Sequence, residues 1–394
     1  MQVWATGVGI ISSIGGDCKA TLESLKHSRS GIGKIKHLKT MHNLPVGEID
    51  MDYDELLRCA GLPQNTISVR TPLIGLIAAR QAVAQADIVD CKKYKIAFVS
   101  GTTVGGMDRM EQFYDHFLND NTKNSYLYPH DIGDSSDFIA SNIGIFSFVT
   151  SISTACSSAA NAIIFGAELI KHGKADIAVC GGCESLSLYH LNGFNSLKIL
   201  DSNPCRPFDI SRAGLNLGEG AGYVVLENSD VAIARGAEPL CRLSGYGNAC
   251  DAYHQTATSE NAQGPYLAMS KALKLAHLKH SEISCVNAHG TGTGNNDLTE
   301  CVALKRIFGN DVPSFSSTKA FTGHATSAAG GIEAVISILC LQNNFLPANL
   351  RFKSIDSALG LMPAIEPMDI YCENIMTNSF GFGGNDTSLI FSKI

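Results

Sequence analysis

The stretch VTSISTACSSAANAIIFGAELI, residues 149–170, reads as a Ser-rich strand that turns into a helix of small residues, with Cys156 at the turn. A later stretch, VPSFSSTKAFTGHATSAAGGIEAVISIL at 312–339, repeats that pattern. Three further pairs of segments match in the same order along the chain. They are 3–13 with 241–251, 95–106 with 283–294, and 176–185 with 374–386. The sequence therefore predicts two related halves, 1–244 and 245–394.

The alternation of short apolar runs with longer helical patterns indicates an α/β fold, in which helices cover sheets. Equivalent strand ends of two such halves should meet at a pseudo-twofold axis. Ligand sites in α/β proteins commonly lie at strand carboxyl ends and between domains. We therefore expect the loops that carry Cys156, His289, His324 and Phe382 to converge in one site.

The bulk composition excludes several classes of protein. The 394 residues are 45% hydrophobic and carry a net charge of -7, which argues against a nucleic-acid-binding protein. No window approaches the roughly 20 apolar residues of a membrane span. The apolar start of the chain is interrupted by glycines and lacks a preceding positive charge, so it reads as a strand rather than a signal peptide. Thirteen cysteines without framework spacing predict a reducing, cytoplasmic location.

Cys156 is placed where a thiol can act as a nucleophile. At the amino end of a helix, unpaired N–H groups and the helix dipole favour a thiolate. Small neighbours would let a bulky acyl chain approach, and backbone N–H groups could hold the oxyanion of an acyl-transfer intermediate. The alternative is a small buried residue without a chemical role.

Two histidines lie in segments that suit catalysis. His289 follows an apolar strand and enters a loop of glycines and threonines, and His324 lies between Lys319 and Glu333. A lysine and a glutamate beside a histidine can fix its orientation and protonation. The sequence contains no apparent metal-ligand cluster or nucleotide-binding motif. The alternatives are a structural histidine and a surface ion pair.

The segment NSFGFGGND, 378–386, places Phe380 and Phe382 among glycines. Such rings can shield a thioester from water, although a core strand with a bulge is the alternative. The pair Cys180 and Cys183 forms a CxxC, which without partner ligands we interpret as structural.

Together these motifs resemble those of the β-ketoacyl-[acyl carrier protein] synthases, in the elongating branch of the thiolase-like superfamily. The resemblance covers nearly the whole chain. It rests on TACSS, NAHGTGT, SSTKAFTGHATSAAGGIE and NSFGFGG, with support from RPFDISRAGLNLGEGAGYVVLE and DAYHQTATSEN. It implies two duplicated halves packed as an αβαβα sandwich.

The resemblance also implies roles for matching residues. Cys156 would accept the acyl group as a thioester, and His289 and His324 would hold the malonyl thioester carbonyl during decarboxylation. Lys319 and Glu333 would support the His324 side of the site. The oxyanion would rest on the backbone N–H groups of Cys156 and Phe382.

Further residues would bind the substrate or its carrier. Thr291, Thr293 and, more weakly, Thr256 would contact the phosphopantetheine arm, which arrives on the acyl carrier protein, so no separate cofactor is expected. Phe382 would gate the entrance with Phe380 beside it. Met110 would line the acyl pocket. Arg70 and Arg206 are candidates for docking the acidic carrier. We expect a homodimer.

Three positions depart from the usual family pattern and leave the pathway open between fatty-acid, polyene and polyketide synthesis. Asp386 lies in GGND instead of GGTN, Ser327 replaces a glycine, and Leu215 replaces a phenylalanine. Two other functions compete with a homodimeric synthase. One is a subunit, active or chain-length-determining, of a heterodimer. The other is a coenzyme A-dependent thiolase, which the absence of a second cysteine in the carboxyl-terminal loop disfavours.

Overall fold

The computed structural model describes residues 2–88 and 91–394. Within these residues, ten strands form the main sheet in the order β3-β2-β4-β5-β1-β6-β12-β11-β7-β8. The first half supplies β1 (Val3–Ser12), β2 (Ile96–Gly101), β3 (Phe148–Ile152), β4 (Ile177–Glu184) and β5 (Gly220–Asn228). The second half supplies β6 (Cys241–Cys250), β7 (Cys285–Asn287), β8 (Ser314–Ser316), β11 (Asn374–Gly381) and β12 (Asn385–Ser392). The short strands β9 (Phe345–Leu346) and β10 (Met368–Asp369) pair separately.

The strand order is duplicated. The order 3-2-4-5-1 of the first half recurs as 8-7-11-12-6 in the second. The two half-sheets join where β1 pairs with β6, through Trp4 opposite Arg242 and Ala5 opposite Cys241. The four pairs of similar segments found in the sequence fall on β1 and β6, β2 and β7, β3 and β8, and β4 and β11. Each pair occupies equivalent positions in the two half-sheets.

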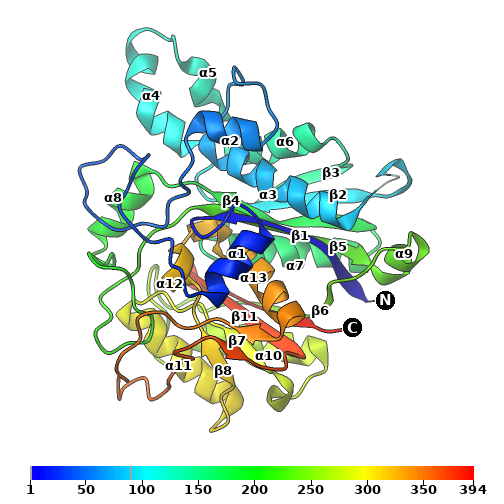
Figure 1. Cartoon of the computed structure of the whole chain (residues 1–394), viewed down its shortest axis with the longest axis vertical. Helices are drawn as coiled ribbons and strands as arrows, with labels where there is room; N and C mark the ends of the chain where they lie inside the picture. The colour runs from blue at the N-terminus through cyan, green and yellow to red at the C-terminus, as the bar shows by residue number, and fades with distance from the viewer. Residues whose placement is uncertain (1, 89–90) are drawn as a thin grey trace.

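Helices form layers between and outside the half-sheets (Figure 1). The helices α7 (Ser158–Lys171) and α13 (Ala329–Asn343) pack against each other and against strands of both halves. The outer layers contain α3 (Arg70–Ala86) on the first half-sheet and α10 (Gln263–Ala276) with α11 (Gly294–Phe308) on the second. The predicted αβαβα layering is confirmed.

The buried side chains follow the same layers. Ile163 and Val335 belong to one cluster between the half-sheets, Leu73 to a cluster under α3, and Met269 to a cluster under α10. Small residues on α7 and α13 allow the central helices to approach the strands closely. A Cβ on Gly331, for example, would lie 2.4 Å from the carbonyl oxygen of Gly222.

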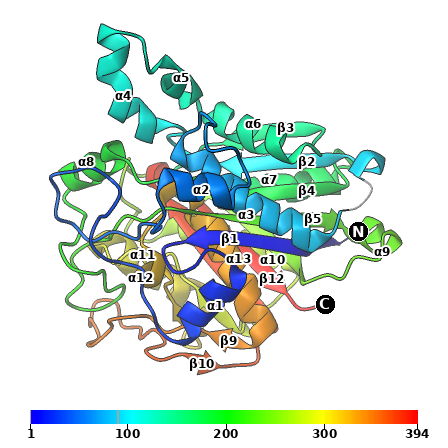
Figure 2. The same cartoon turned by 45° about the horizontal axis from the view of Figure 1, so that its top comes forward.

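The other helices connect these layers. They are α1 (Cys18–Lys26), α2 (Tyr53–Cys59), α4 (Met107–Asn119), α5 (Asn124–Leu127), α6 (Ile132–Ile143), α8 (Leu188–Ser196), α9 (Ser229–Ala234) and α12 (Lys319–Thr322). In Figure 2, α4 and α5 project away from the layered body. Across the described part of the chain, every helix is too short or too polar to cross a bilayer.

The division between the halves is best drawn a few residues before 245, because residue 245 lies inside β6. We propose that it falls between α9 and β6.

The two cysteines of the CxxC, Cys180 and Cys183, point to opposite faces of β4, because residues three apart on a strand do so. Cys180 packs against Gly166 of α7, and Cys183 packs against Gly75 of α3.

Candidate active site

Cys156 lies on a tight turn between β3 and α7. Ala155 before it has a φ of 52°, which is unusual for a residue with a side chain. Local hydrogen bonds hold this turn: Ser158 Oγ donates to the carbonyl of Ala155 (2.6 Å), and Thr154 N–H donates to Ser158 Oγ (2.9 Å). The thiol is thereby fixed at the amino end of α7, as the sequence predicted.

The structure brings Cys156, His289 and His324 to one cavity. Cys156 Sγ lies 3.1 Å from His324 Nε2. The two imidazole rings have centroids 5.4 Å apart and are nearly perpendicular, at 87°. A sulfur from the first half and two imidazoles from the second therefore face one space, which contains room for a substrate carbonyl.

The resting thiol is protonated, contrary to our expectation of a thiolate. Burial raises the pKa of Cys156 to about 11, and this effect exceeds the lowering by Lys319 and by the backbone N–H groups of Phe382 and Cys156. The expectation was wrong because it counted the helix terminus and left out desolvation. The same two N–H groups that bind the sulfur are those expected to hold an oxyanion.

His289 is held by Lys319. Lys319 Nζ donates to His289 Nδ1 over 3.1 Å. Burial, Lys319 and His324 keep the pKa of His289 well below its usual value, so the ring is neutral. A neutral ring that accepts at Nδ1 carries its proton on Nε2, from which it can donate to a substrate oxygen.

Lys319 was assigned to the wrong histidine from the sequence. We expected Lys319 and Glu333 to support His324, but the ammonium contacts His289 and forms a buried ion pair with Glu333. Burial raises the pKa of Glu333 to about 7 despite the ammonium. Lys319 lies on the short helix α12 and Glu333 on α13, so the tertiary packing of these helices determines the pairing.

His324 faces the nucleophile. Burial, and then the charges of Lys319 and His190, keep the pKa of His324 well below its usual value. Its backbone is fixed by N–H donation to the carbonyl of Asn216, over 2.8 Å. A neutral His324 can accept the Cys156 proton at Nε2.

Glu300 is a residue that the sequence analysis missed. Its buried carboxylate accepts the backbone N–H groups of His289 and Gly290, each at 2.8 Å. Burial raises its pKa to about 7. It lies eleven residues after His289 at helical spacing on α11. An acid nearly two helix turns beyond the Gly/Thr loop was the available signal.

Aromatic rings form the entrance. Phe382 stacks on Phe194, with centroids 5.8 Å apart and planes at 19°, and Phe380 lies 5.8 Å from the His289 ring. Gly383 and Gly384 follow with φ of 80° and 77°, which side chains rarely adopt. The predicted gate loop, residues 380–384, therefore lines the cavity. Phe194 also lines it, and the sequence did not predict this residue.

The other predicted binding residues are distributed unevenly. Thr291, Thr293 and Thr256 line the cavity, and the hydroxyls of Thr291 and Thr293 lie 2.9 Å apart. Met110 lies on α4 and does not line this cavity. Arg206 is partly exposed and bonds Asp201 at 3.0 Å.

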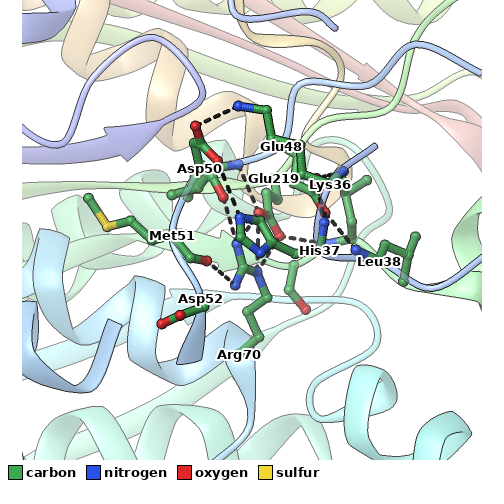
Figure 3. A network of polar contacts seen from close by, with 12 residues as sticks. Lys36, His37, Leu38, Glu48, Asp50, Met51, Asp52, Arg70 and Glu219 are labelled. Atoms are coloured by element: carbon green, nitrogen blue, oxygen red, sulfur yellow. Dashed lines mark hydrogen bonds and ion pairs between the residues drawn. The ribbon is translucent and has the colours of Figure 1, made fainter. Parts of the chain in front are cut away.

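Arg70 does not fit its predicted role in docking a carrier. Figure 3 shows its guanidinium at the centre of a polar network. The side chain is only 7% exposed and forms an ion pair with Glu219 at 2.6 Å. It also donates to the carbonyls of Ile49 and Met51 at 2.9 Å. A guanidinium satisfied in this way anchors the 49–51 segment and is not available to a partner.

The three departures from the family pattern lie around the site. Leu215 lines the cavity. Ser327 Oγ donates to buried Glu184 at 2.5 Å. Asp386 is buried on β12, directly after the gate loop.

Two family descriptions match this chain. The N-terminal domain of beta-ketoacyl synthase matches residues 2–232, and the C-terminal domain matches residues 240–353. The 3-oxoacyl-[acyl-carrier-protein] synthase 2 of Staphylococcus aureus (strain N315) is 32% identical, over 100% of this chain and 98% of that protein. The enzyme of the same name from Vibrio harveyi is 30% identical, over 100% and 99%.

Solved structures give the same result. The ishigamide ketosynthase/chain length factor matches with a TM-score of 0.93 and 29% identity, covering 100% of this chain and 99% of that chain. A ketosynthase in complex with its chain length factor from Xenorhabdus doucetiae matches with a TM-score of 0.86 and 30% identity, covering 100% and 98%.

Proposed function

This chain belongs to the β-ketoacyl synthase family and is an acyltransferase that makes 3-oxoacyl thioesters; from that premise we propose which residues carry each step. The first step is acyl transfer. Cys156 loses its proton to His324 Nε2, 3.1 Å away, and its sulfur attacks the thioester of the acyl carrier protein. The carrier's phosphopantetheine thiol leaves with a proton returned from His324, and the acyl group remains on Cys156.

The second step is decarboxylation of the malonyl thioester. Its carbonyl oxygen accepts hydrogen bonds from Nε2–H of His289 and of His324, which stabilise the enolate as carbon dioxide leaves. Both rings must be neutral and protonated at Nε2 for this step, so His324, which accepts at Nε2 during acyl transfer, first exchanges its Nδ1 proton with water for a proton at Nε2. Lys319 ensures this for His289 by donating to Nδ1.

The third step forms the new carbon–carbon bond. The enolate carbon attacks the carbonyl of acyl-Cys156, and the developing oxyanion is held by the backbone N–H groups of Cys156 and Phe382. Collapse of this intermediate breaks the bond to Cys156 and releases a 3-oxoacyl chain on the carrier. The Cys156 thiolate takes the Nε2 proton of His324, which gains a proton at Nδ1 from water, and the site returns to its resting form.

One observation carries this assignment: Cys156 Sγ and both imidazoles share a single cavity, with Sγ within hydrogen-bonding distance of His324. The test uses purified protein with acyl-carrier and radiolabelled malonyl-carrier. Cys156→Ala should abolish the acyl-enzyme seen by mass spectrometry. His289→Ala should chiefly block decarboxylative condensation, and His324→Ala should slow both acyl transfer and condensation. Full condensation activity in the Cys156→Ala protein would refute the assignment.

The cellular setting is inferred from the thiols. All thirteen cysteines are free, which supports a reducing compartment and a cytoplasmic enzyme.

The substrate and its carrier would contact further residues. The phosphopantetheine arm would pass Thr291 and Thr293 to reach Cys156. Arg206 remains a candidate contact for the carrier. Met110 lies on α4 outside this cavity, so its role in lining the acyl pocket stays a prediction.

We infer that a second subunit covers the free edge of β3. This strand ends the sheet and pairs only with β2 among the described residues. Phe148 on β3 and Phe165 on α7 are 43% and 38% exposed, and their rings lie 6.5 Å apart. An edge strand beside exposed aromatic rings favours pairing with another chain, and we propose a homodimer.

A second candidate is the active subunit of a heterodimer. It is favoured by the structural likeness to a ketosynthase/chain length factor, with its TM-score of 0.93. Analytical ultracentrifugation of the purified chain, together with its condensation rate, distinguishes the two. A dimer active alone supports the homodimer. A monomer that is inactive until a related subunit is added supports the heterodimer.

A further inference from the structure

We propose that Asp386 is a positioning residue that must remain a neutral acid for the Phe382 loop to keep its catalytic place, so that ionising it switches the enzyme off at alkaline pH. The inference rests on the proposed function in one respect: the backbone N–H of Phe382 is taken as an oxyanion-binding group. It goes further by assigning a regulatory role to a residue outside the cavity.

Asp386 is buried directly behind the gate loop. It is 1% exposed and lies on β12, opposite Phe380 of β11 and Ala249 of β6. Its Oδ2 has no hydrogen-bond partner within the described residues. A Cβ on Gly264 would come within 2.0 Å of this oxygen, so the carboxyl fits against α10 only because residue 264 is a glycine.

The groups that face Asp386 are acidic or uncharged. Asp251, just after β6, and Glu300, on α11, both act on it and make its ionisation harder. On β11, Phe380 lies opposite Asp386, and the amide of Asn378 donates to Glu300 over 3.3 Å. α10 contributes Gly264 at the closest point. Among the described residues, no Lys, Arg or His side chain offsets a negative charge on Asp386.

Asp251 connects this acidic cluster to the gate loop. Its carboxylate already accepts Ser259 N–H at 2.6 Å and Gly264 N–H at 2.9 Å. Its backbone N–H donates to the carbonyl of Gly384 at 2.9 Å, and the adjoining Gly383 donates to the carbonyl of Gln255 at 2.8 Å. The loop that carries Phe382 is therefore hydrogen-bonded to the segment 251–255. A negative charge on Asp386 would repel the Asp251 carboxylate at the start of this segment.

Burial, followed by the charges of Asp251 and Glu300, raises the pKa of Asp386 to about 8. At neutral pH the carboxyl is protonated and the hairpin closes around it. Above pH 8 the proton leaves to solvent, and an unpaired carboxylate lies between two acids in a buried site. Such a charge is relieved by moving toward water, which displaces the start of β12 and the loop before it. An asparagine at this position could not do this, because its amide does not ionise.

The experiment compares wild type with Asp386→Asn, which keeps the shape and removes the ionisation. The condensation kcat/KM is measured from pH 6.5 to 9.5 with acyl-carrier and malonyl-carrier. At pH 9 a group of pKa near 8 is about nine-tenths ionised. The ratio of wild-type to variant rate should therefore fall about tenfold between pH 7 and pH 9. The matched control is Asp137→Asn, the same carboxyl-to-amide change at an exposed position, and it should follow wild type.

A second readout does not depend on catalysis. Amide hydrogen exchange of the peptide spanning the β11–β12 hairpin, corrected for the chemical exchange rate, should accelerate between pH 7 and 9 in wild type only. This measurement on wild type also serves if Asp386→Asn fails to fold. Parallel rate profiles in wild type and Asp386→Asn, or pH-independent exchange of the hairpin, would overturn the inference. Absence of condensation in all proteins at every pH would instead count against the proposed function.

Discussion

Replacing Lys319 and Glu333 together by Met and Gln should separate the two half-reactions of this enzyme. Lys319 Nζ donates to His289 Nδ1 at 3.1 Å and forms an ion pair with Glu333. A hydrogen bond to a charged group contributes about 1.5–3 kcal/mol. If that energy keeps the His289 proton on Nε2, its loss slows decarboxylation by roughly 10- to 150-fold.

Acyl transfer should be affected much less, because Cys156 contacts His324 rather than Lys319. The charges of Lys319 and Glu333 shift the pKa of Cys156 in opposite directions, so removing both leaves a smaller net effect than removing either one. Acylation is followed by the intact mass of the protein, and decarboxylation by release of labelled carbon dioxide from malonyl-carrier. Loss of acylation and decarboxylation by the same factor would refute the reasoning.

The single variant Lys319→Met provides the structural control. It leaves the Glu333 carboxyl buried without its partner, which should lower the free energy of unfolding by about 3–5 kcal/mol. The double variant should recover part of that loss, as measured by urea denaturation. Decarboxylation should remain slow in both. Slow decarboxylation in a double variant that has regained stability would show that Lys319 acts by keeping the His289 proton on Nε2, and not by stabilising the fold.

Three other outcomes are expected. Because the pKa of Cys156 is about 11, its alkylation by iodoacetamide should rise about tenfold per pH unit from pH 7 to 10, and a plateau below pH 8 would contradict a protonated resting thiol. Leu215→Phe adds volume to the cavity wall and should lower kcat/KM more for long or unsaturated acyl chains than for short ones; an unchanged ratio would show that this wall does not select substrates. Burying a Phe side chain contributes about 1.5–3 kcal/mol. Phe148→Asp should therefore raise the dissociation constant of the proposed dimer about tenfold or more, as measured by sedimentation. An unchanged dissociation constant would place the interface elsewhere.

The fold was predictable because the sequence repeats its own pattern. Four pairs of matched segments mapped onto equivalent strands, and the layers followed from that duplication. The meeting of Cys156 with the two histidines followed from the same argument, since equivalent strand ends converge at a pseudo-twofold axis.

What the sequence could not give was the direction and burial of individual side chains. Lys319 is five residues from His324 in the chain, yet it contacts His289, thirty residues away. Arg70 is a charged residue that the fold buries against Glu219. The protonation of Cys156 depends on desolvation, which spacing does not report. Each of these errors concerns what surrounds a side chain in space.

The duplicated sheet also determines where the two ends of the chain emerge. Trp4 pairs with Arg242, and Arg242 pairs with Ser392, so the two ends lie two strand spacings, or about 10 Å, apart. β1 runs in the same direction as β4, through the antiparallel β5, and β12 runs antiparallel to β11. Both ends therefore leave the sheet opposite the loops that carry Cys156 and Phe382, and the labels N and C lie on the same side of the molecule in Figure 2. A short tether could join them, and new ends could be opened elsewhere. A circularly permuted enzyme, or one fused to its carrier at either end, would keep the loops around Cys156 unchanged.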